Sequence, residues 1–373
     1  TITPYWPDGL INPKLSWEET KQFDAGLDLE FFGNRLSFEL DYYYRYTDKL
    51  LAQVTLPGDY NAYISQWQNA YAISNQGIEL QIKADFVRSE KLHWDFSFNI
   101  ARNWNRFEKS NNGMDFTNLA SKHNLNIIGK PLNGIYVYND QGYYNSQDEV
   151  PLYYVNGRRK YLSSLGNQIY TPGDRRIQDV DGNGQVATMV PLLEDRVYGG
   201  SPLPLAFGGI ATTLKWKGID VNLLFSYKLG RHVLNAGRGA SVGTILRANT
   251  AEMMVPILAD LDKVSFWQKP GDNTDFPINE LENGKNNFAT NLKSNVEKIN
   301  YLKLKSISIG YTLPVFPKQS KHYARVFMSV ENVFTITNSS SPDPESIDIV
   351  TGVDSNNNYP LATRYTLGLT LNL

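Results

Sequence analysis

The sequence predicts an all-β fold, a transmembrane antiparallel β-barrel with long extracellular loops. Three observations predict it: long segments that alternate apolar and polar residues, connections that are alternately short and very long, and many aromatic residues. Aromatics make up 13% of the 373 residues, with 23 Tyr, and there are 28 Gly. Alternation with a period of two gives each strand one apolar face. In a barrel of this kind that face contacts lipid.

The pattern is clearest from Phe23 to Tyr46, on both sides of Gly33-Asn34. The apolar positions are Phe23, Ala25, Leu27, Leu29 and Phe31 on the first arm, and Leu36, Phe38, Leu40, Tyr42, Tyr44 and Tyr46 on the second. Such a pair around a Gly-Asn turn predicts a β-hairpin. Each arm exceeds the ~5–6 residues of an average strand and is near the roughly 9–11 that cross a bilayer.

Three more hairpins and a last strand follow. The hairpins pair Gln76–Phe86 with Leu92–Trp104, Ala206–Trp216 with Ile219–Leu229, and Tyr301–Leu313 with Tyr323–Val333, and the last strand is Thr363–Leu373. Between them we expect a connection from about Asp48 to Ser74, an irregular segment of about a hundred residues before Ala206, and a second long segment up to about Asn300. The one helical candidate, Ala251–Leu261, is interrupted by Pro256.

Alternation of short turns and long loops is typical of outer-membrane barrels. Two soluble β-domains are the alternative, although loops of a hundred residues are unusual there. Nine strands is an odd number, whereas bacterial single-chain barrels have an even number. We therefore expect residues 1–373 to be the C-terminal part of a larger barrel, whose remaining strands come from an upstream segment. On this interpretation the present span does not close by itself.

Composition limits the classes of function. The net charge of −2 gives no electrostatic reason to expect nucleic acid as a partner. The absence of Cys excludes disulfides and thiolate metal sites. The four His have no metal-ligand spacing, and no nucleophile or phosphate-binding motif occurs. The sequence therefore predicts that the protein is not an enzyme.

One motif predicts a structural Ca²⁺ site in an extracellular loop. Asp179, Asp181 and Asn183 occupy positions one, three and five of a calcium loop, and Gly184 the sixth. Gln185 would add its backbone carbonyl, but position twelve is Val190, so Glu194 or Asp195 would have to close the site. The alternative is a network of Asx turns without an ion, because Asp, Asn and Gly favour turns by themselves.

Aromatic residues have two expected roles. On the apolar faces they form the girdles at the two membrane interfaces: Tyr42, Tyr44, Tyr46, Trp94, Trp104 and Trp216. In the long segments, Trp67, Tyr143, Tyr144 and Trp267 are candidates for contact with a substrate or with a lipoprotein lid. Packing within the loops is the alternative for each of these four. Tyr43 differs from its neighbours, since its position in the alternation points it into the lumen.

Several blocks, in order, resemble the SusC/RagA-type TonB-dependent transporters of Bacteroidetes. They are Asn12–Glu18, Ile128–Leu132, Gly142–Tyr144, Pro172–Asp174, Asp179–Gly184, Tyr301–Lys305, Gly310–Pro314, Glu331–Phe334, Asp343–Glu345 and Tyr359-Pro360. The resemblance covers essentially the whole chain. The C-terminal pattern Thr366–Leu373 also looks like a signal for barrel assembly, except that it ends in Leu instead of an aromatic residue.

The resemblance implies a 22-stranded barrel in the bacterial outer membrane, with an N-terminal plug and a SusD-like surface lipoprotein as partner. It implies import of an oligosaccharide or a peptide, driven by the TonB complex. The plug and the TonB box have no counterpart in this chain. Two alternatives remain: a barrel for secretion or for anchoring a protein partner, and a membrane-embedded hydrolase, for which a nucleophile and base are lacking. No cofactor is required beyond the proposed Ca²⁺.

Overall fold

A computed structural model of the chain describes most of its residues. They are 10–56, 65–110, 116–117, 123–155, 157–164, 167–186, 195–237, 265–278, 285, 289–314, 323–355 and 359–372. The expected helix Ala251–Leu261 lies outside them, as do Val190 and Glu194.

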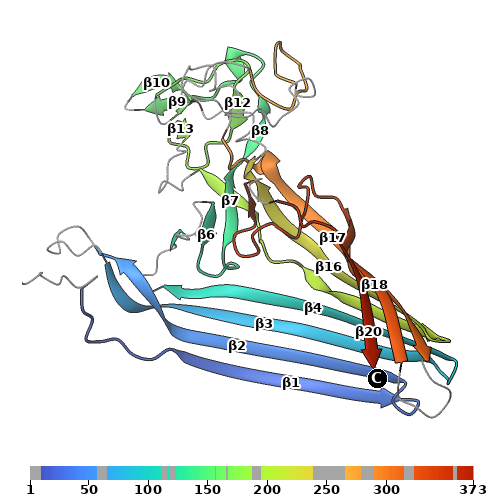
Figure 1. Cartoon of the computed structure of the whole chain (residues 1–373). Coiled ribbons are helices and arrows are strands. Elements are labelled where there is room, and N and C mark those ends of the chain that lie inside the picture. Colours follow the sequence, from blue (N-terminus) through green and yellow to red (C-terminus); the bar gives the residue numbers. More distant parts are fainter. Residues whose placement is uncertain are drawn as a thin grey trace, which may run out of the picture.

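Nine long strands form one curved antiparallel sheet (Figure 1). They are β1 (Glu19–Phe31), β2 (Leu36–Thr55), β3 (Ser65–Arg88), β4 (Leu92–Ser110), β15 (Ala206–Trp216), β16 (Ile219–Asn235), β17 (Val296–Pro314), β18 (Tyr323–Thr337) and β20 (Arg364–Asn372). Their order in the sheet is their order in the chain, and the short β19 (Val353–Asp354) pairs in parallel with β16 beside this path. The four predicted hairpins and the last strand are therefore confirmed.

The short turns contain the residues that such turns require. Gly33 and Asn34 both have a left-handed backbone, with φ of 65° and 63°, between the paired residues Phe31 and Leu36. Lys217-Gly218 also has positive φ and joins Trp216 directly to Ile219. Because neighbouring strands are antiparallel, these turns gather at one end of the sheet, at the lower right of Figure 1.

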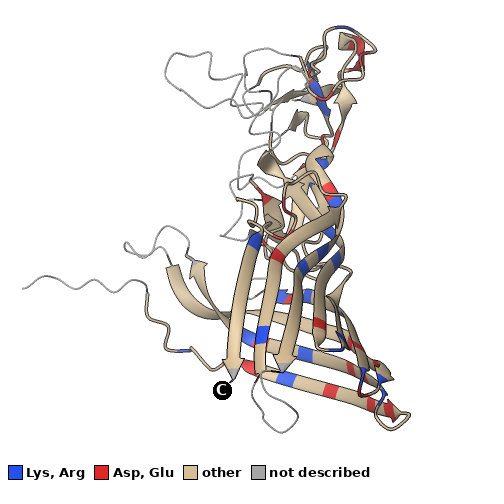
Figure 2. Ribbon diagram, turned by 45° about the vertical axis from the view of Figure 1, so that its right-hand side comes forward, with Lys and Arg blue, Asp and Glu red and all other residues tan. Residues whose placement is uncertain are grey.

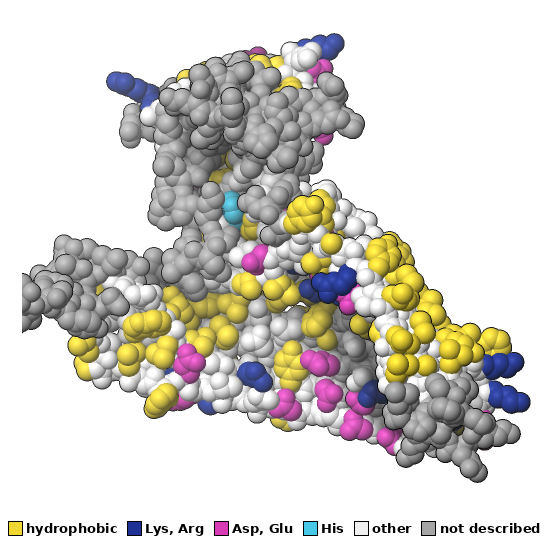
Figure 3. All heavy atoms as spheres, viewed as in Figure 1, with side chains coloured by type: hydrophobic (Ala, Val, Ile, Leu, Met, Phe, Trp, Pro, Cys, Tyr) yellow, Lys and Arg dark blue, Asp and Glu magenta, His cyan; other side chains and the backbone are white. Residues whose placement is uncertain are grey.

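One face of the sheet is apolar although it is exposed. Residues on this face that remain exposed include Phe23, Leu27, Leu29, Phe31, Leu40, Ile78, Trp94, Leu214, Trp216, Ile309, Tyr311, Val326, Met328, Leu367 and Leu369. Figure 3 shows hydrophobic side chains gathered over the C-terminal strands at the right of the view. An exposed apolar surface of this extent is costly in water but suits contact with the hydrocarbon of a membrane.

The strands at the N-terminal side are longer than predicted. β2 continues to Thr55, β3 begins at Ser65 and β4 reaches Ser110, so the expectation of a loop from Asp48 to Ser74 is wrong. The pairing of β2 with β3 shifts between Thr47 and Leu51, where residues are skipped on both strands. Such irregularities interrupt the period-two pattern, so the extension has no clear signal in the sequence.

A compact head of short strands replaces the irregular segment that we expected before Ala206. Its strands are β5 (Phe116–Thr117), β6 (Asn124–Asn126), β7 (Gly134–Tyr138), β8 (Asp140–Tyr143), β9 (Leu152–Val155), β10 (Arg158–Tyr161), β11 (Ser163–Ser164), β12 (Arg175–Ile177), β13 (Gln185–Val186) and β14 (Arg196–Gly200). Two 3-10 turns, η1 (Gln147–Glu149) and η3 (Lys293–Asn295), accompany them. Most of the head stands at the top of Figure 1, away from the short turns, whereas the strands labelled β6 and β7 lie lower, next to the long strands.

The head has its own hydrophobic core. Its buried members are Tyr138, Tyr144, Val150, Leu162, Tyr170, Ile177, Val186 and Leu292. Leu292 comes from the second long connection, so two distant segments of the chain form this core together. In the described part of the chain, no helix is long and apolar enough to span a membrane.

The sheet has two open edges among the described residues. β1 pairs only with β2, and β20 pairs only with β18. All backbone groups of a membrane-spanning sheet need partners, because lipid offers none. Closure by further strands therefore remains a prediction of the sequence.

Candidate functional site

The inner face of the sheet carries a polar cavity near its N-terminal strands. It has a volume of about 520 Å³ and is lined by Asp24, Tyr43, Arg45, Asn75, Glu79 and Asn103. The Tyr43 hydroxyl and the Asn103 Oδ1 are hydrogen-bonded at 3.0 Å, with the hydroxyl as donor. Figure 2 marks several Lys, Arg, Asp and Glu positions along these long strands. Tyr43 thus faces the polar side of the sheet, as its place in the alternation predicts.

A second polar cavity lies in the head, around the predicted contact residue Tyr143. Its volume is about 550 Å³ and its lining includes Asp140, Tyr143, Arg175, Arg176, Asp272 and Asp275. The Tyr143 hydroxyl donates to the Thr274 carbonyl at 3.2 Å. The Arg175 guanidinium lies 5.4 Å from the ring centre of Tyr143 and donates to the Asp140 carboxylate at 2.9 Å. The cavity therefore offers positively charged hydrogen-bond donors and negatively charged acceptors beside an aromatic ring.

This cavity joins segments that are far apart in the chain. The Asn145 side chain accepts a hydrogen bond from the Gly271 amide at 2.7 Å, and Asp140 accepts one from the Ser294 amide at 2.9 Å. The first contact holds the segment around Gly271 next to the end of β8, and the second holds η3 against β8. Apart from Gly142 and Tyr143, the sequence analysis named none of the lining residues, because the spacing of Asp140, Arg175 and Asp272 does not predict that they meet.

The other predicted contact residues lie elsewhere. Tyr144 is 1% exposed in the head core, and burial raises the pKa of its hydroxyl to about 12. Trp267 is 6% exposed and packs on Gly173, where a Cβ would lie 2.6 Å from the indole ring. Both residues therefore pack the head, which is the alternative stated above, and the expectation of surface contact is corrected for them. Trp67 is 53% exposed at the far end of β3, outside both cavities.

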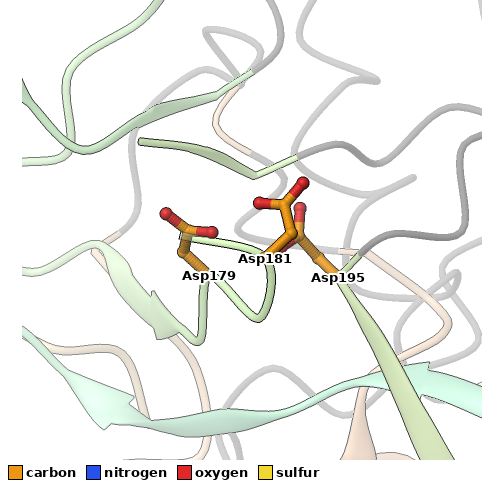
Figure 4. A group of neighbouring side chains, drawn as sticks. All are labelled: Asp179, Asp181 and Asp195. Atoms are coloured by element: carbon orange, nitrogen blue, oxygen red, sulfur yellow. The ribbon is translucent and has the colours of Figure 1, made fainter. Parts of the chain in front are cut away.

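The acidic loop brings three of its five predicted ligand residues together. Oxygens of Asp179, Asp181 and Asp195 all lie within 4.8 Å of one another (Figure 4). Asn183 is engaged with Asp181, to which it donates through its side chain at 2.7 Å. The Gln185 side chain turns away and donates to Asn167 at 2.9 Å, so only its backbone carbonyl is left for an ion.

The loop also satisfies much of its own hydrogen bonding. Asp179 accepts from the amides of Gly182 and Gly184, both at 2.8 Å, and Asp195 accepts from the Val180 amide at 2.8 Å. The two bonds of Asp179 are local, as the alternative interpretation expects, whereas the Asp195 bond joins two segments. The carboxylate spacing still fits Ca²⁺, because two ligands at about 2.3–2.6 Å from one ion lie up to about 5 Å apart. Burial and the neighbouring Asp179 raise the pKa of Tyr153 to about 12.

The connection between β18 and β20 forms a third feature; its residues Asp343–Glu345 were named in the sequence analysis, but their ion pairs with β17 were not predicted. Lys303 on β17 pairs with Asp343 at 3.2 Å and with Glu345 at 2.9 Å, and Lys305 pairs with Glu345 at 2.8 Å. Arg231 on β16 is 1% exposed and donates to the carbonyls of Pro202, Ile347 and Asp348. Buried cations thus fix this connection, called here the anchored loop (residues 338–355), against the sheet.

Both the sequence and the fold of the chain are similar to those of known proteins. The sequence model of the family described as "TonB dependent receptor-like, beta-barrel" matches residues 2–237. The chain belongs to this family. Its relatives include the TonB-dependent receptor P3 of Formosa agariphila, 29% identical over 96% of this chain and 34% of the relative. Another is the TonB-dependent receptor SusC of Bacteroides thetaiotaomicron, 24% identical over 97% of this chain and 32% of the relative.

Solved structures agree with the fold of this TonB-dependent receptor. The structure of the RagAB peptide transporter superposes with a TM-score of 0.69 at 24% identity, and covers 100% of this chain and 38% of the other. The same importer in its "open-open" state gives a TM-score of 0.64. The predicted resemblance and the all-β barrel class are therefore confirmed. The present chain spans about a third of the length of the curated relatives that it matches.

Membership in the family also decides location and class. This TonB-dependent receptor is a bacterial outer-membrane protein, as predicted. The curated relatives are named as TonB-dependent receptors, and the prediction that the protein is not an enzyme agrees with this class.

Proposed function

We propose that this chain is the C-terminal barrel portion of a SusC-like importer, which takes an oligosaccharide or a peptide across the outer membrane with energy from the TonB complex. The observation that carries the proposal is the similarity of nearly the whole chain to TonB-dependent receptors, SusC included. The polar inner face and the head at one end of the sheet suit a pore with a substrate-capturing mouth.

The partner belongs to the same proposal. A SusD-like lipoprotein binds the head from outside, and the plug and TonB box are supplied by a part of the protein beyond this span. The solved RagAB complex is titled a peptide transporter, which supports peptide as one of the two substrate classes. The resemblance of the sequence to SusC/RagA-type transporters implies an oligosaccharide as the other class, so we keep both classes.

The head cavity is the proposed point of substrate contact. Tyr143 borders it, and Arg176, Asp272 and Asp275 add charges of both signs. A volume of about 550 Å³ lies in the usual range for small-molecule sites, which suits part of a peptide or of an oligosaccharide. Ca²⁺ bound by Asp179, Asp181 and Asp195 has a separate role, since it stiffens the acidic loop and takes no part in transport.

Uptake by intact cells tests the proposal. A strain that lacks the gene is complemented with the full-length transporter and grown on a mixed peptide digest or on a mixed oligosaccharide digest as the limiting nutrient. We expect growth on one digest to depend on the transporter and on TonB, and a lipoprotein to copurify in mild detergent. Growth that is unchanged by loss of the transporter, with adhesins or secreted proteins copurifying instead, would overturn import.

The double variant Arg176→Ala/Asp272→Ala tests the head cavity in the same strain. We expect slower growth at limiting nutrient and normal growth when the nutrient is abundant, because substrate capture is weakened and the pore is not. Arg158→Ala/Asp148→Ala, which removes one exposed charge of each sign elsewhere in the head, is the matched control. Equal growth of both variants at limiting nutrient would exclude the head cavity as the contact site.

A further inference from the structure

The outward face of β1 to β4 changes character in regular rows toward the end opposite the short turns. Each row consists of directly paired residues, one on each strand, whose side chains point to the same face. From the middle of the sheet outward the rows are Leu27–Leu40–Leu80–Ile100, then Ala25–Tyr42–Ile78–Arg102, then Phe23–Tyr44–Gln76–Trp104, then Lys21–Tyr46–Ser74–Arg106. The face thus passes from aliphatic to aromatic to basic.

The height of the last row agrees with that of lipid headgroups. Tyr46 lies ten residues from Leu36, the first residue after the turn. At about 3.3 Å per residue and a tilt of about 40°, this distance raises the row roughly 25 Å above the turn. The apolar band of an outer-membrane barrel is also about 25 Å tall. The basic row therefore lies where hydrocarbon gives way to headgroups, on the side of the long loops.

Arg102 supports this position of the basic row, because its backbone lies within the apolar band. A cation that faces lipid is costly there unless its charged group reaches the interface. The Arg102 guanidinium lies 4.4 Å from the ring centre of Trp104, which is the next residue on the same face toward the basic row. The side chain therefore runs along the surface toward the headgroups, over an aromatic ring that stabilises the cation.

A small cavity of about 290 Å³ adjoins the basic row. It lies between the end of β4 and residues 129–131, and Tyr44, Trp104, Arg106 and Lys130 line it. The segment is held to β4 by two backbone hydrogen bonds, from Phe107 to Lys130 at 2.9 Å and from Gly129 to Phe107 at 2.7 Å. Gly129 approaches Arg106 closely, since a Cβ there would lie 3.4 Å from Nη2. Arg106 and Lys130 are thereby brought to one pocket.

The charge of this surface is positive after its acidic groups are counted. Glu108 lines the cavity, but it accepts a hydrogen bond from Ser74 at 2.6 Å and lies 3.7 Å from Arg106. Asp48 is paired with Lys109 at 3.0 Å, and Glu19 with Lys49. Across the described residues, Lys21, Arg102 and Lys130 have no ion pair.

We propose that Arg102, Arg106 and Lys130 form a binding site for the phosphorylated headgroup of an outer-leaflet glycolipid, whose acyl chains lie along the apolar rows below. The charge complementarity, the aromatic row and the continuity with the apolar band all point to an anionic lipid. The site is independent of the imported substrate, because it faces away from the lumen.

Native mass spectrometry of the full transporter complex in mild detergent tests the site, with a chelator present so that divalent ions do not bridge charges. The probes are diphosphorylated lipid A, the same lipid A without phosphates, and phosphatidylethanolamine. We expect selective retention of the diphosphorylated form. The variant Arg102→Gln/Arg106→Gln/Lys130→Gln should lower its affinity roughly fivefold per cation, on the order of a hundredfold in total.

Two further variants make the result unambiguous. Arg158→Gln/Arg159→Gln/Lys160→Gln removes the same charge from exposed positions of the head and should retain the lipid. If the Gln variant at the site does not fold, Arg102→Lys/Arg106→Lys keeps the charge and should bind with affinity close to that of the unmodified complex. Equal retention of phosphorylated and phosphate-free lipid A, or equal loss in the head variant, would overturn the site.

Discussion

At the scale of single residues, buried cations organise the anchored loop. The Arg231 guanidinium has donors for three separate carbonyl oxygens, whereas an ammonium is a single point of charge. These acceptors come from residue 202 and from residues 347–348, so one side chain joins two connections to β16. Neither partner segment could be named from the sequence, because the contacts span up to 117 positions.

Arg231→Lys should therefore destabilise this region. Replacement leaves at least one buried carbonyl without a donor, which costs about 1–3 kcal/mol. We expect faster hydrogen exchange in residues 341–355 and little change in the head, measured by mass spectrometry on the full transporter. Arg159→Lys, an exposed arginine of the head, is the control. Unchanged exchange in the anchored loop would show that Arg231 is dispensable there.

The same loop should loosen in acid. Burial alone would raise the pKa of Glu345, but hydrogen bonds and charges from Lys305 and Lys303 outweigh it, so the pKa is lowered. A carboxyl whose folded pKa is below its unfolded value stabilises the fold above about pH 4.3, and this contribution is lost as the pH falls through the folded pKa. Limited proteolysis should cut residues 338–355 faster at low pH, and Glu345→Gln should remove most of that dependence.

At the scale of elements, strand pairing explains residues that would weaken an isolated strand. Gly77 is in the middle of β3, where glycine usually weakens a strand. The Tyr43 ring of the neighbouring strand covers it, and a Cβ at Gly77 would lie 2.5 Å from that ring. The aromatic ring supplies the packing that the missing side chain does not.

Gly77→Ala should accordingly destabilise the sheet through a clash with Tyr43, by about 1–3 kcal/mol. In a Tyr43→Ala background the same change should cost much less, because the ring is gone. The test is a double-mutant cycle on the urea midpoint of the full transporter. An equal cost of Gly77→Ala in both backgrounds would mean that the ring does not cause the effect.

The acidic loop is the second element with a testable prediction. If it binds Ca²⁺, then Tb³⁺ should bind in its place and emit when nearby tyrosines are excited. Asp179→Asn/Asp181→Asn should abolish Ca²⁺-displaceable emission. Tyr153→Phe should dim the emission while Ca²⁺ still competes for the site. Emission that Ca²⁺ does not displace in the unmodified protein would favour the Asx-turn network without an ion.

At the scale of the whole molecule, the open edges of β1 and β20 determine what the chain can do alone. We expect the full-length protein to migrate in SDS gels as a compact, heat-modifiable barrel. Residues 1–373 expressed and refolded alone should not, because two unpaired strand edges in lipid are costly. A compact, heat-modifiable form of the 373-residue chain would contradict the prediction of additional strands.

The sequence by itself determined the nine strands, the short turns, the lipid face and the family resemblance. These features depend on local alternation, on Gly and Asn at turns, and on blocks of neighbouring residues, all of which one segment carries alone. The tertiary structure decided the head core with Tyr144, the packing of Trp267 on Gly173, the head cavity around Tyr143, the anchored loop and the basic row. Each of these depends on which strands pair and in what register, and that outcome is a property of several distant segments together.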